Sequence, residues 1–202
     1  MSTLYPVICP VSETFKSLPL GRRPAALSRM AKNAVTLSAE KIGLPVPVTF
    51  QKNDRGAPVA EKGVWWSASH KPDYVAGVVS TFPIGIDVEK ILPRSESLIA
   101  KAVSPAEAAL FSRDRWTIFF RCWTAKEAAL KSRGVGIADL SRCRVVSVVN
   151  DTRLVVRFNG ANLSVEQFFF DHHVASVTRP DQCVVAWTVS DCEAMANRSS
   201  TL

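Results

Sequence analysis

The sequence predicts an α+β fold built from two halves that meet near Phe82. Helical spacing of apolar residues and strand-like alternation both occur before Phe82, and both patterns recur after it. A chain of 202 residues, 47% hydrophobic and 21% charged, can also bury a substantial core. We therefore expect an N-terminal half over residues 1–82, a C-terminal half over residues 83–190, and a polar tail over residues 191–202.

The N-terminal half is expected to contain one long helix followed by strands. Leu27, Met30 and Ala34 recur at roughly helical spacing, which predicts a helix over residues 25–42 that ends at Gly43. A turn rich in Asn, Asp, Gly and Pro is expected where "KNDRGAP" occurs. Strands are predicted at "VPVTFQ" (46–51), "VWWSASH" (64–70), "YVAGVVS" (74–80) and "FPIGIDVEK" (82–90).

The C-terminal half is expected to turn helical and then return to sheet. Ser104 to Glu107, "SPAE", is typical of a capping box with proline at the first helical position. A helix over residues 114–132 should end at Gly134 and Gly136. Alternation predicts strands at "RVVSVV" (144–149), "RLVVRF" (153–158), "EQFFF" (166–170) and "CVVAWTV" (183–189).

The strand "FPIGIDVEK" carries two carboxylates on one face. Ile86 and Val88 point one way on a pleated strand, whereas Asp87 and Glu89 point the other way. Two interpretations stay open on these residues alone: a solvated strand edge, or a cation site.

The predicted helix over residues 114–132 places more charges in an apolar setting. Trp123, Glu127 and Lys131 lie four apart and so share one face, and Lys126 lies one step round from Glu127. An amphipathic surface helix with a Glu–Lys pair is the ordinary interpretation. The apolar neighbours argue instead that these charges have partners.

Asp87, Glu89 and Glu127 together supply three carboxylates, which suit Mg²⁺ or Mn²⁺. Magnesium keeps some waters and takes further oxygens from a substrate phosphate. Lys126 and Lys131 are the cations that a diphosphate would need beside such a metal.

Three further groups of polar residues have both a functional and an ordinary interpretation. Ser67, Ser69, His70 and Lys71 form a phosphate site or an ordinary polar turn. His172–His173 is a metal pair or a surface pair. Arg22 and Arg23 either are solvated surface charges or belong to the same phosphate site as these four residues.

Composition limits the class of protein. The net charge of +7 favours anionic partners, but there is no basic helix stripe or aromatic RNA-binding motif, so nucleic acid is not expected. We see no signal peptide and no run of ~18 apolar residues, so no membrane partner is expected. The five cysteines never form a C-x-x-C pair, which indicates reduced, mostly buried thiols. We expect a soluble, cytoplasmic monomer.

Two motifs in order resemble the signature of the phosphopantetheinyl transferases, specifically the single-chain Sfp type. These motifs are "GIDVEK" at residues 85–90 and "WTAKEAALK" at residues 123–131. Upstream, "SASH" (67–70) is similar to the family's Ser-His segment, and "RGAP" (55–58) to its Gly-Lys-Pro turn. The resemblance extends from about Arg22 to the C-terminal strands.

The resemblance implies magnesium-dependent transfer of 4′-phosphopantetheine from coenzyme A to a serine of an apo acyl or peptidyl carrier protein. Adenosine 3′,5′-bisphosphate would be released. The resemblance also implies that the two α+β halves are similar and form an intramolecular pseudo-dimer, with the active site in the cleft between them. Fatty-acid, polyketide and nonribosomal-peptide carriers all stay open.

The resemblance also implies a role for each matching residue. Asp87, Glu89 and Glu127 would hold Mg²⁺, with Mn²⁺ as the alternative. Catalysis would rest on Glu127 as general base and Lys131 as the cation that neutralises the leaving phosphate. The coenzyme A-binding residues would be Arg22, Arg55, Ser69, His70, Asp87, Lys126 and Lys131.

Two positions depart from the family pattern. Ala57 stands where the family has the lysine of its Gly-Lys-Pro turn, so that contact is missing or has moved to Arg55 or Lys52. Lys71 stands where a small polar residue is common. The altered turn is the one feature that favours the alternative, a non-catalytic module that binds coenzyme A or a carrier protein.

Overall fold

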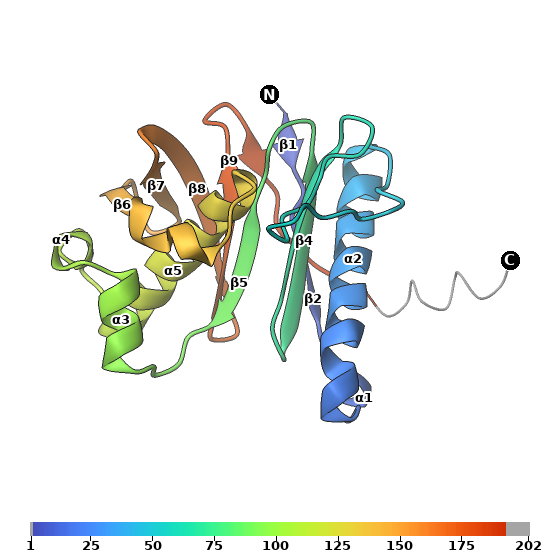
Figure 1. The fold of residues 1–202 in the computed structure, drawn as a ribbon, viewed down its shortest axis with the longest axis horizontal. Coiled ribbons are helices and arrows are strands. Elements are labelled where there is room, and N and C mark those ends of the chain that lie inside the picture. Colours follow the sequence, from blue (N-terminus) through green and yellow to red (C-terminus); the bar gives the residue numbers. More distant parts are fainter. Residues whose placement is uncertain (1, 193–202) are drawn as a thin grey trace, which may run out of the picture.

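The structure, a computed structural model, describes residues 2–192, and most of the predicted polar tail lies outside these described residues. Figure 1 shows two β-sheets packed between two long helices, α2 (Arg23–Ile42) and α5 (Arg115–Ser132). Three layers of apolar contacts join them: α2 to the four-stranded sheet, one sheet to the other, and the five-stranded sheet to α5. The predicted α+β class is confirmed; the pseudo-dimer stays a prediction.

The N-terminal sheet has the strand order β11-β2-β4-β3 and is covered on one face by α2. Helix α2 spans Arg23–Ile42 and ends at Gly43, whose φ of 71° is the left-handed cap conformation that glycine favours. The predicted helix is thereby confirmed. The remaining elements of this half are β1 (Thr3–Leu4), β2 (Val7–Pro10), α1 (Glu13–Lys16), η1 (Leu20–Arg22), β3 (Trp65–His70) and β4 (Tyr74–Ser80).

The strand predicted over residues 46–51 is wrong. This segment belongs to no sheet; the backbone N–H groups of Val48 and Thr49 instead donate to the carboxylate of Glu61, at 3.2 and 3.0 Å. Pro47, within this segment, also has no backbone N–H to donate to a neighbouring strand. The predicted turn after it is present, closed by a bridge between Lys52 and Pro58.

The C-terminal sheet is wholly antiparallel, in the order β5-β9-β8-β7-β6. Helix α5 (Arg115–Ser132) packs across it and is N-capped by Asp114, which accepts from the N–H groups of Trp116 and Thr117. The capping box of Ser104 and Glu107 is also confirmed. The other elements are β5 (Ile86–Lys90), α3 (Glu96–Ala102), α4 (Pro105–Ala108), η2 (Ile137–Arg142), β6 (Cys143–Val148), β7 (Arg153–Phe158), β8 (Ala161–Phe170) and β9 (His173–Arg179).

Two features of this half differ from the prediction. Strand β9 was not predicted, although it pairs β5 with the rest of the sheet. It buries His173, so the interpretation of His172–His173 as a surface pair is wrong for His173. The segment "CVVAWTV" was predicted as one strand of this half. It forms β10 (Val184–Val185) and β11 (Thr188–Val189), which pair in parallel with β1 and β2 of the N-terminal half.

This return of the chain overturns the prediction that all cysteines are reduced. Because β11 runs beside β2, Cys192 reaches Cys9, and the two form a disulfide with a Cα–Cα distance of 5.6 Å. Cys122, Cys143 and Cys183 are buried free thiols, as predicted. Burial raises the pKa of Cys122 and of Cys143 to about 12, so both stay protonated.

Within residues 2–192, none of the helices has the length and apolar content of a membrane-spanning segment.

Strand β5 is bound to the edge of the N-terminal sheet by serine hydroxyls. The Oγ of Ser67 accepts from the N–H of Ile86 at 3.0 Å, and the Oγ of Ser69 accepts from the N–H of Val88 at 3.4 Å. These side chains satisfy buried donors that a neighbouring strand would otherwise bind. The alternating serines of "SASH" therefore connect the two sheets, with Ile86 and Val88 in the apolar layer between them.

Gly85 allows the start of β5 to lie directly against α5. A Cβ at this position would overlap the backbone of Ala128 and Ser132 in the helix. Only a residue without a side chain fits there, and this close packing is what brings the acidic face of β5 to the charged face of α5.

We predict that Gly85→Ala destabilises the protein by about 3 kcal/mol or more, because the clash involves helix backbone that cannot move aside locally. Urea denaturation measures this. Gly21→Ala is the control: a Cβ there meets nothing within 4 Å, so its effect should stay within about 0.5 kcal/mol. Equal stabilities for the two variants would contradict this account of Gly85.

Candidate active site

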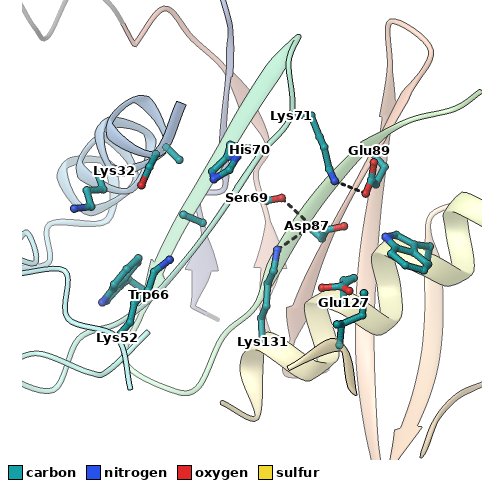
Figure 2. Close-up of a pocket in the computed structure, with 15 residues that line it drawn as sticks. Lys32, Lys52, Trp66, Ser69, His70, Lys71, Asp87, Glu89, Glu127 and Lys131 are labelled. Carbon is teal, nitrogen blue, oxygen red and sulfur yellow. Dashed lines mark hydrogen bonds and ion pairs between the residues drawn. The ribbon is translucent and has the colours of Figure 1, made fainter. Parts of the chain in front are cut away.

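A cavity of about 350 Å³ lies where the edges of the two sheets meet. Its walls come from α2, β3, β5 and α5, so both halves contribute (Figure 2). The predicted residues Ser69, His70, Asp87, Glu89, Glu127 and Lys131 all line it, together with Ser28, Ala31, Lys32, Lys52, Trp66, Ala68, Lys71, Trp123 and Ile137.

The two acids of β5 are buried, with 4% of Asp87 and 5% of Glu89 exposed. The interpretation of this strand as a solvated edge is therefore wrong. The Oδ1 atom of Asp87 accepts from Ser69 Oγ at 2.7 Å and from Lys131 Nζ at 2.8 Å. Its Oδ2 atom is also buried but has no hydrogen-bond partner among residues 2–192. Asp87 thus has one oxygen fully engaged and one unsatisfied.

Glu89 is paired with Lys71, whose Nζ lies 2.6 Å from its Oε1. Burial raises the pKa of Glu89, and the charge of Asp87 raises it further, whereas Lys71 opposes both effects. Lys71 thus favours the ionised form of Glu89, against the effects of burial and of Asp87.

Glu127 faces the same space from α5, as does Lys131 (Figure 2), and Trp123 of the same helix also lines the cavity. Within the described part of the chain its carboxylate has no hydrogen bond or ion pair. Burial raises the pKa of Glu127, with a second contribution from the charge of Asp87. The predicted common face of Trp123, Glu127 and Lys131 is confirmed, because all three line one cavity.

Lys126 points away from this cavity. Its side chain is 1% exposed, and its Nζ lies 2.6 Å from Glu107 Oε1 and donates to the carbonyl of Ala102. Burial alone would raise the pKa of Glu107, but the hydrogen bonds from Lys126, Ser104 and Val145 lower it. This position does not support the predicted contact of Lys126 with coenzyme A. Adjacent residues of a helix point about 100° apart, so Lys126 faces away from the cavity that Glu127 lines.

The N-terminal half lines the cavity with cationic and polar groups. Lys32 of α2 and Lys52 lie across from Glu89 and Glu127 (Figure 2). Burial lowers the pKa of His70, and Lys131 lowers it further, so the imidazole is neutral at pH 7.

The two predicted arginines differ in their placement. Arg55 lines an adjoining cavity of about 200 Å³ that shares Lys52, Glu127 and Lys131 with the first one. Arg22 is exposed at the N-terminal end of α2 and lines neither of these two cavities.

Sequence reasoning missed Lys32 and Trp66 as members of the site. Ser28 and Lys32 lie four apart on α2, so the helical period could have placed them on one face. Nothing in the sequence shows that this face points toward Asp87, because α2 and β5 are far apart in the chain.

The donor set of the cavity fits a hard divalent cation only partly. Among residues 2–192, no group of three or more His, Cys, Asp or Glu side chains is arranged as a metal site. Two acids nevertheless offer unengaged oxygen, namely the buried Oδ2 of Asp87 and the carboxylate of Glu127. Magnesium commonly binds one or two protein carboxylates together with substrate phosphate, so these two acids fit it.

Comparison with known proteins decides the family. The sequence model of ACPS, the 4′-phosphopantetheinyl transferase superfamily, matches residues 83–187, which include every acid of the cavity. The chain belongs to this superfamily. Its assignment to the Sfp type stays a prediction.

Curated relatives from this superfamily match different lengths of the chain. 4′-Phosphopantetheinyl transferase HetI of a Nostoc species is 37% identical over 113 residues, which are 50% of this chain and 48% of HetI. The psf-1 transferase of Bacillus pumilus is 27% identical over 79% of this chain and 73% of its own length. AcpT of Salmonella typhi is 30% identical over 58% of this chain and 70% of its own length. The chain thus spans about half the length of HetI.

We predict that Lys126→Met destabilises the protein by about 3–5 kcal/mol, because it leaves Glu107 buried without its counter-charge. Thermal or urea unfolding measures the loss. Lys101→Met, at an exposed position of α3, is the control and should change stability by less than about 0.5 kcal/mol. Adding E107Q to K126M should recover part of the loss; a double variant no more stable than K126M would contradict the pairing.

We predict that the pKa of Glu127 in metal-free protein lies above the usual 4.5 and falls in Asp87→Asn, because that change removes a nearby negative charge. Carboxyl ¹³C NMR titration measures both values. Asp151→Asn is the control, since Asp151 is a surface partner of Arg113 and should leave Glu127 unchanged. A Glu127 pKa that is indifferent to Asp87→Asn would show that the two carboxylates do not interact.

Proposed function

We propose that this protein transfers 4′-phosphopantetheine from coenzyme A to a serine of an apo acyl or peptidyl carrier protein, in a Mg²⁺-dependent reaction that releases adenosine 3′,5′-bisphosphate. One observation carries the proposal: Asp87 of "GIDVEK" and Glu127 and Lys131 of "WTAKEAALK" line a single cavity. These motifs lie on separate elements, β5 and α5, and the superfamily match covers both.

Asp87 and Glu127 are the residues that would hold the cation. The unsatisfied Oδ2 of Asp87 and the unpaired carboxylate of Glu127 are the oxygen donors that support this assignment. When bound, Mg²⁺ would neutralise charge on the diphosphate of coenzyme A. Glu89, the third predicted ligand, lies beside Asp87 but is paired with Lys71.

Lys131 would stabilise the phosphate that leaves. Its ammonium is fixed by Asp87 Oδ1 at 2.8 Å and by the carbonyl of Ile86 at 3.0 Å, yet 24% of its side chain is exposed to the cavity. A cation oriented before the reaction stabilises developing charge without reorganisation during the step. Asp87 would therefore both bind the cation and hold the ammonium of Lys131 in position.

Glu127 would accept the proton of the carrier serine, directly or through a water. Its raised pKa supports this role, because a general base works best when its pKa approaches the working pH. As the serine oxygen bonds to the β-phosphorus, the bond from that phosphorus to the bridging oxygen breaks. The displaced phosphate leaves as part of adenosine 3′,5′-bisphosphate.

The nucleotide end of coenzyme A would occupy the side of the cavity formed by the N-terminal half. Lys52, Lys32 and the neutral His70 supply donors there, and Arg55 extends this set into the adjoining cavity. Lys52 lines both cavities, which supports it as the replacement for the lysine absent at Ala57. The net charge of +7 would favour an acidic carrier.

The reaction is tested by incubating the protein with Mg²⁺, coenzyme A and a panel of apo carriers. One carrier should gain a mass of about 340 Da, the size of the transferred group, and a chelator should abolish the gain. Wild-type protein that binds coenzyme A but modifies no carrier would instead support the non-catalytic binding module.

We predict that Glu127→Gln lowers turnover by about 10²–10⁴-fold while coenzyme A still binds, because the variant removes the base but leaves the cationic side of the cavity. Mass spectrometry and calorimetry measure the two properties. Glu40→Gln, at an exposed position of α2, should label carriers as wild type does. Undiminished turnover in Glu127→Gln would remove Glu127 from the mechanism.

A further inference from the structure

Ser69 is the cavity residue whose hydroxyl contacts β5 in two ways. It lies on β3, the edge strand of the N-terminal sheet, and only 6% of it is exposed. Its Oγ donates to Asp87 Oδ1 at 2.7 Å and accepts from the N–H of Val88 at 3.4 Å. Ser69 therefore joins the two halves and also contacts one of the two acids that would hold the cation.

The hydroxyl of Ser69 has a single proton, and Asp87 receives it. Phosphate oxygens accept hydrogen bonds, so a serine that binds a phosphate through its side chain must donate this proton. The existing contact is buried and has a charged acceptor, which makes it one of the stronger kinds of hydrogen bond. Ser69 would have to give up Asp87 in order to bind a phosphate, which counts against the coenzyme A contact that the resemblance implies for it.

The hydrogen bonds on one oxygen of Asp87 determine where the other oxygen points. A carboxylate is planar and rigid, so fixing Oδ1 also fixes the direction of Oδ2. Figure 2 shows Ser69 and Lys131 on one side of the Asp87 carboxylate. Glu127 lies on the other side, and Oδ2 has no hydrogen-bond partner among the described residues. The donors on Oδ1 thus leave Oδ2 for a cation that Glu127 also binds.

The two donors on Oδ1 differ in how firmly they are held. Lys131 has a long side chain that is 24% exposed, and the proposed reaction requires its ammonium at the leaving phosphate. The short side chain of Ser69 extends from a strand whose backbone is fixed by its pairing with Ala76 on β4. Ser69 is therefore the donor that keeps Asp87 in place while Lys131 acts on the substrate.

We infer that Ser69 is a positioning residue: its hydroxyl holds Asp87 through Oδ1, so that Oδ2 is presented to the cation, and it does not bind the phosphates of coenzyme A. This inference rests on the cation site of the proposed function. Groups that hydrogen-bond to a metal-binding carboxylate orient that ligand, and their loss typically weakens metal binding about 10–100-fold. Ser69 has this relation to Asp87.

The first test is a Mn²⁺ titration followed by electron paramagnetic resonance, without coenzyme A or carrier. Ser69→Ala should bind Mn²⁺ at least ~10-fold more weakly than wild type, because the carboxylate of Asp87 loses the donor that fixes it. The carboxyl ¹³C resonance of Asp87 in metal-free protein should also shift, since one of its hydrogen bonds is removed. Urea denaturation establishes that each variant is folded.

Ser67→Ala is the matched control. Ser67 lies two residues earlier on β3 and accepts from the N–H of Ile86 at 3.0 Å, so it connects β3 to β5 as Ser69 does. Its hydroxyl contacts no carboxylate of the described residues, so its removal should change Mn²⁺ affinity less than ~3-fold. Equal losses in the two variants, or no loss in Ser69→Ala, would show that Ser69 only connects the sheets and would overturn the inference.

Coenzyme A binding distinguishes a positioning role from a phosphate contact. With a chelator present, Ser69→Ala should bind coenzyme A within ~3-fold of wild type in calorimetry, because the wild-type hydroxyl has no proton free for a phosphate. A direct hydrogen bond from Ser69 to a phosphate would instead make the variant bind at least ~10-fold more weakly. That result would overturn the inference.

A crystal structure of wild-type protein with Mn²⁺ and coenzyme A is a second test, which needs no variant. The cation should contact Asp87 Oδ2, with Ser69 Oγ still within ~3.2 Å of Oδ1. A phosphate oxygen bound to Ser69 Oγ, or wild-type protein with no affinity for Mn²⁺, overturns the inference. Carrier labelling is measured separately, so a failure of the proposed function is recognised by absent labelling even where the cation results are as expected.

Discussion

The contact of β5 with α5 at Gly85 is the constraint on which the site depends. A side chain at Gly85 would overlap the helix backbone, so the strand and the helix approach each other as closely as backbones can. This approach lets Lys131 donate to the carbonyl of Ile86 and to Asp87 at the same time. The charged residues of β5 and α5 are far apart in the chain. They form one cluster because Gly85 has no side chain to hold the strand and the helix apart.

The electrostatics of the cavity follow from this packing. A buried ionised carboxylate is costly unless a cation or a hydrogen-bond donor faces it. Asp87 is stabilised by Lys131 and Ser69, and Glu89 by Lys71. Glu127 has no hydrogen bond or ion pair in the described structure, and its pKa is raised first by burial and then by the charge of Asp87. A structural pair of the same kind, Lys126 with Glu107, lies one residue round the helix.

Local sequence patterns predicted the elements that carry the site. The helical period located α2 and α5, and strand-like alternation located β3, β4 and β5, because each of these elements is long enough to show its periodicity. The patterns failed where elements are very short, as for β1 and β2, or where side chains replace the ladder, as at Glu61. Lys126 was misjudged for a related reason: its motif identifies the helix, but the neighbouring α3–α4 segment decides which charged residues face inward.

The sequence by itself determined the family, through two acidic motifs in order, and the common face of Trp123, Glu127 and Lys131, through the helical period. Which side chains meet was decided only by the tertiary structure. The pairing of Lys71 with Glu89, the return of β11 to β2, and the Cys9–Cys192 bond all join segments distant in the chain. Sequence periodicity reports the direction of a side chain relative to its own element, whereas these contacts depend on how whole elements pack together.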